Sequence, residues 1–116
     1  MTSPETTITV TTGTDEVTLI NVFTVEPQRQ NELVAALERA TITVFATTPG
    51  FISANLHASL DGTRVINYAQ WTSEPAYRSA MEQPDVHEHV VESAALATSY
   101  DPTLVQVRAI HHPHQG

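Results

Sequence analysis

Residues 51–71, FISANLHASLDGTRVINYAQW, decide the fold because they have the pattern of a β-hairpin. Two largely apolar runs flank Asp61-Gly62, and an Asp-Gly pair between alternating strands is a strong short-range hairpin signal. The first run alternates between an apolar face and a polar face with Ser53, Asn55, His57 and Ser59. The second run places four residues on one face: Val65, Asn67, Ala69 and Trp71.

The length of the loop decides which faces of the two strands combine. A two-residue loop at Asp61-Gly62 places His57 and Asn67 on opposite sides of the sheet. A three-residue loop, with Gly62 left-handed in a bulge, places His57, Asn67 and Trp71 on one side. We expect the three-residue loop, because it gathers the uncharged polar residues and leaves a mostly apolar opposite face. This polar side predicts a shielded polar cavity, although the plain alternative is a solvated sheet face.

Composition limits the class of protein. The chain has 116 residues, 13 acidic residues, 5 arginines and no lysine, which gives a formal net charge of −8. This length predicts one domain, and the acidic balance argues against nucleic acid or an anionic membrane as a partner. The absence of cysteine excludes disulfides and thiolate chemistry. No signal peptide or membrane-spanning apolar run is visible, so we expect a cytoplasmic protein.

The order of elements predicts a ferredoxin-like α+β fold. Residues 17–25 alternate as a strand, Pro27 suits the first turn of a helix that extends to about residue 47, and Ser73 suits a helix cap. After the helix that Ser73 caps, another helix is expected over residues 85–97, followed by a turn over 100–102 and the last strand over 103–111. This order indicates a split β-α-β unit, an antiparallel four-stranded sheet with helices on one face. We expect the domain at residues 16–111, a flexible arm at 1–15, where residues 8–10 could add an edge strand, and a disordered tail at 112–116.

The outer face of this sheet predicts a homodimer. A sheet with helices on one side normally has a polar outer face. Here that face is expected to carry apolar side chains, namely Ile52, Leu56, Ile66, Tyr68 and Ile110. A second copy of the same sheet is the simplest cover for such a face.

The sequence predicts no metal, nucleotide or acyl-enzyme site. His87 and His89 point to different faces of a helix, and the histidines after residue 110 lie on a frayed end. The four glycines form no phosphate-binding loop, and no strained serine turn is visible. What remains is a cavity with neutral donors, which stabilise a developing oxyanion without adding charge. A histidine there can act as a general base near neutral pH.

Three other elements contribute to this predicted cavity. Asn21 lies in the middle of the first strand on the same face as Phe23, and is either a strand-end hydrogen bonder or a pocket amide. Phe45 ends the apolar stripe of the first helix and is either core or a ligand contact. Tyr77 follows Trp71 by a few residues and shares a side of its helix with Met81.

Four stretches together resemble the antibiotic biosynthesis monooxygenase family, in particular the quinone-forming monooxygenase of actinorhodin biosynthesis. They are Pro49-Gly50-Phe51, His57-Ala58-Ser59 before Asp61-Gly62-Thr63, Asn67-Tyr68-Ala69-Gln70-Trp71 and Ala76-Tyr77-Arg78. The resemblance covers about residues 17–111. It implies a dimer whose two sheets form a barrel, with a pocket between sheet and helices in each subunit. It also implies oxidation of an aromatic polyketide anthrone or quinol to a quinone by molecular oxygen, without a metal, flavin or haem cofactor.

The resemblance implies roles for individual residues. Asn67 and Trp71 would hold the enolate or peroxy oxygen, Tyr77 would hydrogen-bond the substrate, and His57 would assist in binding or proton transfer. The residues that we expect to contact the substrate are Asn21, Phe23, Phe45, Asn55, Met81 and His89. The related enzyme has an arginine in its last helix, whereas residues 85–97 contain none, and His87 or His89 stands in that region.

Two other functions stay open from the sequence. A haem-degrading monooxygenase of the same fold would use an asparagine of the first strand, a tryptophan and a helix histidine, for which Asn21, Trp71 and His87 or His89 are candidates. A dimer that binds a small molecule without catalysis would use the same cavity. The fold alone does not distinguish these functions.

Overall fold

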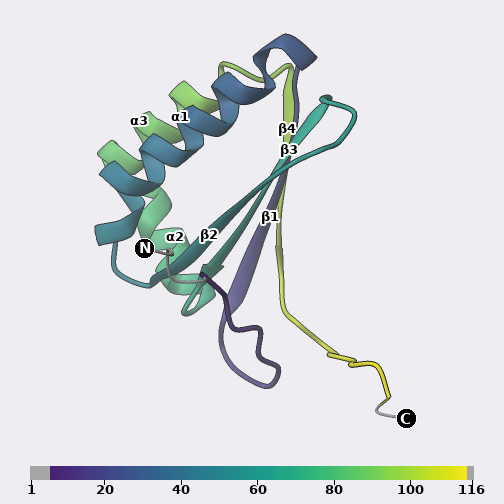
Figure 1. Cartoon of the computed structure of the whole chain (residues 1–116). Coiled ribbons are helices and arrows are strands. Elements are labelled where there is room, and N and C mark those ends of the chain that lie inside the picture. The colour runs from purple at the N-terminus through teal and green to yellow at the C-terminus, as the bar shows by residue number, and fades with distance from the viewer. Residues whose placement is uncertain (1–5, 115–116) are drawn as a thin grey trace, which may run out of the picture.

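The chain forms one antiparallel sheet with helices on one side. The computed structural model describes residues 6–114. Its strands β1 (Val17–Thr24), β2 (Phe51–Ala58), β3 (Arg64–Trp71) and β4 (Ser99–Val105) have the spatial order β2-β3-β1-β4. Helices α1 (Gln30–Thr43), α2 (Glu74–Met81) and α3 (Pro84–Ala94) pack on the same face of this sheet (Figure 1). The predicted ferredoxin-like fold is therefore confirmed; residues 1–5 of the expected arm and 115–116 of the expected tail lie outside the described residues.

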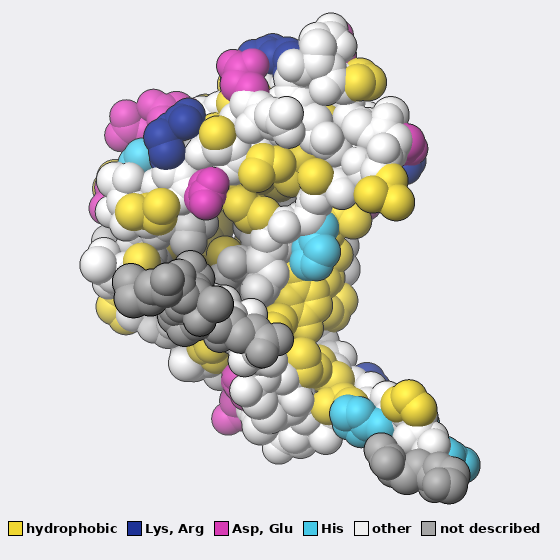
Figure 2. All heavy atoms as spheres, in the orientation of Figure 1, with side chains coloured by type: hydrophobic (Ala, Val, Ile, Leu, Met, Phe, Trp, Pro, Cys, Tyr) yellow, Lys and Arg dark blue, Asp and Glu magenta, His cyan; other side chains and the backbone are white. Residues whose placement is uncertain are grey.

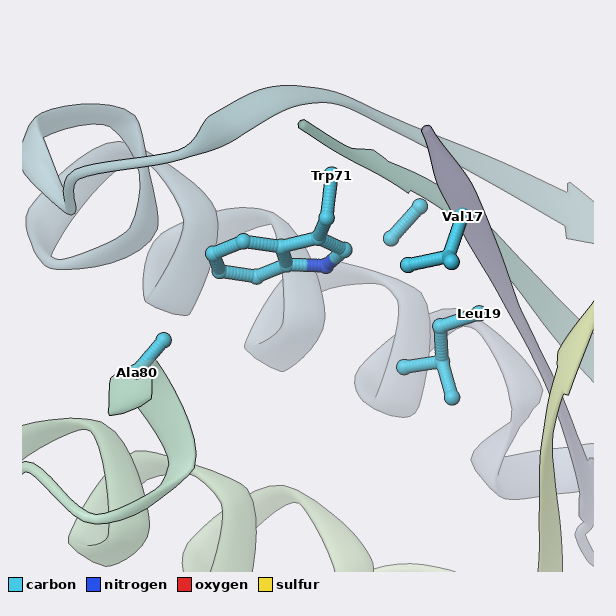
Figure 3. Packing of buried hydrophobic residues seen from close by; sticks show 5 residues of the cluster. Val17, Leu19, Trp71 and Ala80 are labelled. Carbon is cyan, nitrogen blue, oxygen red and sulfur yellow. The ribbon is translucent and has the colours of Figure 1, made fainter. Parts of the chain in front are cut away.

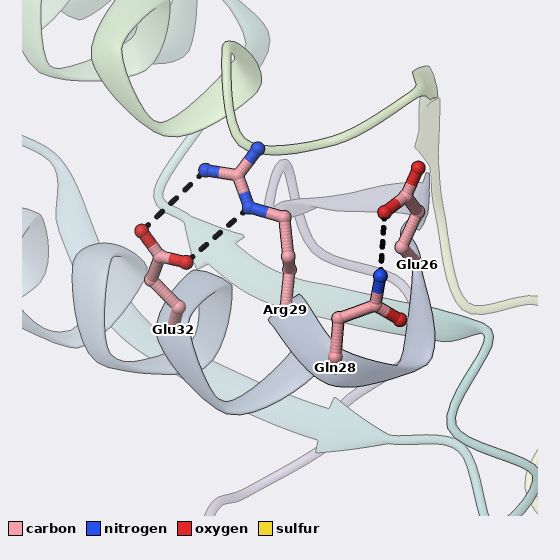
Figure 4. Close-up of polar contacts among 4 residues, drawn as sticks. All are labelled: Glu26, Gln28, Arg29 and Glu32. Carbon is pink, nitrogen blue, oxygen red and sulfur yellow. Dashed lines mark hydrogen bonds and ion pairs between the residues drawn. The ribbon is translucent and has the colours of Figure 1, made fainter.

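The start of α1 combines a proline turn with exposed polar contacts. A 3-10 turn (Pro27–Arg29) leads into the helix, and the fixed φ of proline suits this first turn. Gln28 Nε2 donates to Glu26 Oε2 at 2.8 Å, and Arg29 Nε donates to Glu32 Oε2 at 3.3 Å (Figure 4). Exposed pairs of this kind contribute about 0–1 kcal/mol. The helix is held mainly by its buried side, with Leu33, Leu37 and Ala40.

The connection before α2 places that helix directly beside the end of the hairpin. Ser73 caps α2 by accepting a hydrogen bond from the backbone N–H of Ala76, as its position predicts. The backbone N–H of Thr72 donates to the carbonyl of Gly50 at 2.8 Å, which joins α2 to the start of β2. Gly50 has φ +86°, and a Cβ atom there would lie 2.5 Å from the Cβ atom of Ala76. Only glycine fits this close approach without displacement of the helix.

The sheet face under the helices carries two apolar clusters with a polar level between them. One cluster contains Val17, Leu19, Ala69, Trp71 and Ala80. The other contains Phe23, Val25, Leu33, Leu37 and Val65. Between them, Asn21 of β1 pairs directly with Asn67 of β3. The alternation predicted for these two strands is confirmed, and it brings both amides to the inner face.

The hairpin register differs from the expected one. Leu56 pairs with Asn67 and His57 with Ile66, which is the register of the two-residue alternative. The loop itself is longer, because the backbone N–H of Ser59 donates to the carbonyl of Arg64. Asp61 Oδ1 closes it by accepting hydrogen bonds from Ser59 Oγ and from both the backbone N–H and Oγ1 of Thr63, which lower the pKa of Asp61 to about 2. This register turns Leu56 toward the core and turns His57 to the outer face.

The outer face of the sheet has a polar and an apolar part. Asn55 Nδ2 donates to Ser53 Oγ, Ser53 Oγ donates to Gln70 Oε1, and Gln70 Nε2 donates to the carbonyl of Thr9. This ladder fixes the N-terminal segment on the sheet, although residues 8–10 add no strand. The apolar part consists of Ile20, Val22, Ile66 and Tyr68, all half-buried. Hydrophobic side chains gather between the hairpin and the C-terminal segment in Figure 2.

Two expectations for this face and for the last strand are wrong. Leu56 lies on the inner face and Ile110 lies beyond β4, so neither belongs to the outer apolar surface. The expected turn at residues 100–102 is part of β4, which ends at Val105 rather than at residue 111. Pro102 is tolerated because β4 is an edge strand, paired only with β1 among residues 6–114.

None of the helices in residues 6–114 has both the length and the apolar character that crossing a membrane requires.

Candidate active site

A cavity lies between the middle of the sheet and the helices. Including the solvent at its mouth, its empty space is about 720 Å³. Water centres can occupy about 110 Å³ of this space, several times the ~10–15 Å³ that one buried water requires. Its wall is mostly apolar and aromatic, and it includes Leu19, Leu37, Phe45, Phe51, Ala69, Met81 and Val90. A wall of this kind suits a small organic molecule.

Three polar groups in this wall are buried without a hydrogen-bond partner in the described part of the chain. They are Asn21 Oδ1, Asn67 Oδ1 and Trp71 Nε1. Leaving one such group unpaired costs about 1–3 kcal/mol, so their gathering in one cavity points to a ligand that pairs with them. Rotation of an asparagine amide exchanges its oxygen and its NH2 group, so both amides can also donate.

Aromatic rings fix the position of Trp71. The indole is 1% exposed and meets Phe51, Tyr77 and Phe45 edge-on, with ring centroids 5.4, 5.7 and 6.2 Å away. In Figure 3 it lies under the sheet, with Val17 and Leu19 on one side and Ala80 on the other. Packing on several sides holds the Nε1–H donor in one direction without the help of a hydrogen bond. Such a donor is preorganised for an acceptor that enters the cavity.

Tyr77 adds a neutral hydroxyl to the same wall. It comes from the first turns of α2, and its ring packs against Trp71. Burial raises the pKa of Tyr77 above its ordinary 10.0, and the positive charge of Arg78 opposes this only in part. The phenol therefore stays protonated at neutral pH and can donate to a ligand oxygen.

Most of the residues predicted for the cavity line it. The wall contains Asn21, Phe23, Phe45, Asn67, Trp71, Tyr77, Met81 and His89. The structure does not bring Asn55 and His57 to them. Asn55 is turned to the outer face, where it donates to the carbonyl of Tyr68, and His57 is exposed beside Ile66. Their expected place in the cavity was wrong because the register shift inverts the faces of β2 alone.

Several wall residues were not predicted from the sequence. Phe51 faces the cavity because a bulge between Phe51 and Ser53 breaks the alternation of β2. Tyr100 and Pro102 line the cavity because β4 begins earlier than expected. Two large apolar residues in succession, Phe51 and Ile52, could have indicated that β2 does not alternate strictly at its start. Asp101 and Pro102 are typical of a turn, so the sequence did not indicate a strand there.

Among residues 6–114, no three histidine, aspartate or glutamate side chains come together as ligands for a metal ion. His87 and His89, as expected from their spacing, differ in environment: His87 is exposed, whereas His89 is half-buried in the cavity wall.

The sequence and the fold of the chain match those of known proteins. A family model described as antibiotic biosynthesis monooxygenase matches residues 16–92. The chain belongs to this family. Tetracenomycin-F1 monooxygenase of Streptomyces glaucescens is 42% identical over 81 residues, which cover 70% of this chain and 72% of that protein. Deoxynogalonate monooxygenase of Streptomyces nogalater is 36% identical over 88 residues, which cover 73% and 71%.

Solved structures of the family share the fold. A variant of SnoaB, described as a cofactor-independent oxygenase from Streptomyces nogalater, has a TM-score of 0.74 and 31% identity, over 83% of this chain and 96% of that chain. A monooxygenase from the gene ActVA-Orf6 of Streptomyces coelicolor, solved with nanaomycin D, has a TM-score of 0.74 and 31% identity, over 84% and 92%. The expected family membership is confirmed, and these relatives support a monooxygenase role for this member of the family.

Proposed function

We propose that this family member is a cofactor-independent monooxygenase that oxidises an anthrone or quinol ring of an aromatic polyketide to a quinone with molecular oxygen. The observation that carries this proposal is a set of three buried polar groups, at Asn21, Asn67 and Trp71, which have no hydrogen-bond partner in residues 6–114 and lie inside an otherwise apolar and aromatic wall. A flat aromatic ring with one or two oxygens pairs with these groups and packs on the wall. The relatives that act on tetracenomycin F1 and deoxynogalonate, and the one solved with nanaomycin D, support this substrate class.

The chemistry needs few protein groups. Removing a proton from the anthrone CH2 leaves an electron-rich enolate, which itself reduces O2 and forms a carbon–oxygen bond. Loss of water from the resulting hydroperoxide gives the quinone carbonyl, so that one CH2 and one O2 become one C=O and one H2O. The donors at Trp71, Asn67 and Tyr77 stabilise negative charge on the substrate oxygen or the peroxide, and the apolar wall excludes water. The description of SnoaB as cofactor-independent supports a reaction of this kind.

We also propose that the protein is a homodimer. The half-buried apolar residues Ile20, Val22, Ile66 and Tyr68 form the centre of the sheet face opposite the helices, and Ile52 nearby is 42% exposed. A second copy of the same sheet buries this surface in a symmetric contact. The cavity opens on the other side of the sheet, so each protomer keeps its own site.

Oxygen uptake tests the proposed reaction. With 1,8-dihydroxyanthrone as substrate, in metal-free buffer with a chelator, we expect one O2 consumed per quinone formed, at a rate above spontaneous oxidation. With ¹⁸O2, one labelled atom enters the quinone and the other enters water.

Trp71→Phe keeps the packing of an aromatic ring but removes the Nε1–H donor, and we expect at least about a tenfold loss of kcat/KM, the scale of one lost oxyanion donor. A rate no faster than the uncatalysed reaction, or a requirement for an added metal or flavin, contradicts the proposal.

A further inference from the structure

The cavity wall contains three ionisable side chains among the described residues, and two of them are phenols. They are Tyr77, Tyr100 and His89. The burial that raises the pKa of Tyr77 keeps it a proton donor at neutral pH. The remaining polar wall groups are amides, hydroxyls and an indole, none of which accepts a proton in water near pH 7. An imidazole is the side chain that changes its charge between pH 5 and 8, so the wall offers one group suited to take a proton.

His89 has the position that this task requires. It lies in the middle of α3, half-buried, with 30% of its side chain exposed, between the cavity and solvent. Its Nδ1 atom is 3.9 Å from Oε2 of Glu92, one turn later on the same helix. This is an ion-pair distance rather than a hydrogen bond.

The elements around His89 bring no competing charge into the cavity. In the wall, α1 contributes Thr41, α2 contributes Tyr77 and Met81, and β4 contributes Tyr100. None of these is an acidic or basic side chain, and Glu92 supplies the carboxylate within 4.0 Å of the imidazole in residues 6–114.

We propose that His89 is the general base of the reaction; this inference rests on the proposed function. In the step, the substrate C–H bond breaks, a new N–H bond forms on the imidazole, and the electron pair stays on the substrate as the enolate. This enolate reduces O2 and forms a peroxide anion, which takes the proton back from the imidazole to become the hydroperoxide, and the hydroperoxide then loses water to give the carbonyl. His89 thus ends each turnover neutral, and its exposed edge lets it exchange protons with solvent.

The pH profile of kcat/KM with 1,8-dihydroxyanthrone tests the proposal. For the wild type we expect an acid limb that falls tenfold per pH unit as the base becomes protonated. His89→Gln should lower kcat/KM by about 10²–10⁴-fold and remove this limb, with unchanged binding of 1,8-dihydroxyanthraquinone. A merely structural role for His89 would leave the limb in place.

His87→Gln is the matched control. His87 lies on the same helix but is exposed and outside the cavity wall, so this variant should keep both the rate and the acid limb. Turnover by His89→Gln at the wild-type rate, or with an unchanged limb, overturns the role of His89 while the proposed function stands. Absence of turnover by the wild type overturns the proposed function instead, and the role of His89 with it.

Discussion

At the scale of single residues, the site depends on two asparagines placed where the sheet pattern demands apolar side chains. Asn21 and Asn67 replace core residues on the inner faces of β1 and β3, directly opposite each other, between the two apolar clusters. Each unpaired amide costs about 1–3 kcal/mol in the free protein. A bound molecule that pairs with both amides removes this cost. Two such amides inside an apolar cavity therefore suit a flat molecule with polar edges.

Tyr77 gives a prediction for stability at high pH. Burial raises its pKa above 10.0 in the folded protein, so the folded state favours the protonated phenol. The resulting stabilisation is complete below pH 10 and is lost as the pH rises through the higher pKa of the folded state. We expect Tyr77→Phe to lose less unfolding free energy than the wild type between pH 8 and pH 11, measured by urea unfolding at both values. An equal loss in the two proteins would contradict a raised pKa, since Tyr68 and Tyr100 remain in both.

At the scale of elements, the inner faces of β1 and β3 could be predicted from alternation alone, and with them Asn21, Asn67 and Trp71. The face of β2 could not. The hydrogen bonds of Asp61 with Ser59 and Thr63 close a longer loop than the Asp-Gly pair suggests, and in the resulting register Leu56 packs, partly buried, against the core. Removing apolar surface from water stabilises a fold by about 25 cal/mol per Å², which favours this register over one that turns His57 toward the core.

The ends of the strands were the other part that the sequence did not reveal. A bulge at the start of β2 and a proline in an edge strand both break the local pattern without breaking the sheet. Their positions depend on contacts with Trp71 and with β1, which lie far away in the sequence. Local pattern therefore locates the elements, whereas long-range packing decides how each end is aligned.

Gly50 gives a prediction for the junction between β2 and α2. Gly50→Ala introduces a side chain at φ +86° and within 2.5 Å of the Cβ atom of Ala76. Backbone strain should lower the unfolding free energy by about 1–3 kcal/mol, and we expect the contact with Ala76 to lower it further. Gly13→Ala is the matched control, because Gly13 also has a positive φ, +72°, but a Cβ atom there meets nothing within 4 Å. Chemical denaturation of the two variants compares them, and an equal effect would show that the contact with Ala76 is unimportant.

At the scale of the whole molecule, the two faces of the sheet differ in what they present. The helical side holds the cavity, and the outer side carries the apolar surface that we assign to a second copy. Ile66→Arg, in the middle of the outer face of β3, should convert the proposed dimer to a folded monomer in analytical ultracentrifugation. Ile42→Arg on α1, where the isoleucine is already 71% exposed, should leave the dimer intact. A wild-type protein that is a single monomeric species at micromolar concentration would contradict the proposed dimer.

The most direct test of where the chemistry takes place compares the two faces of the hairpin in one assay. Asn67 and His57 lie on adjacent strands but on opposite sides of the sheet. In oxygen uptake with 1,8-dihydroxyanthrone, we expect Asn67→Ala to lose at least about tenfold in kcat/KM and His57→Ala to keep the wild-type value. The reverse result, a folded Asn67→Ala with full activity and an inactive His57→Ala, would place the chemistry on the outer face of the sheet and not in the cavity.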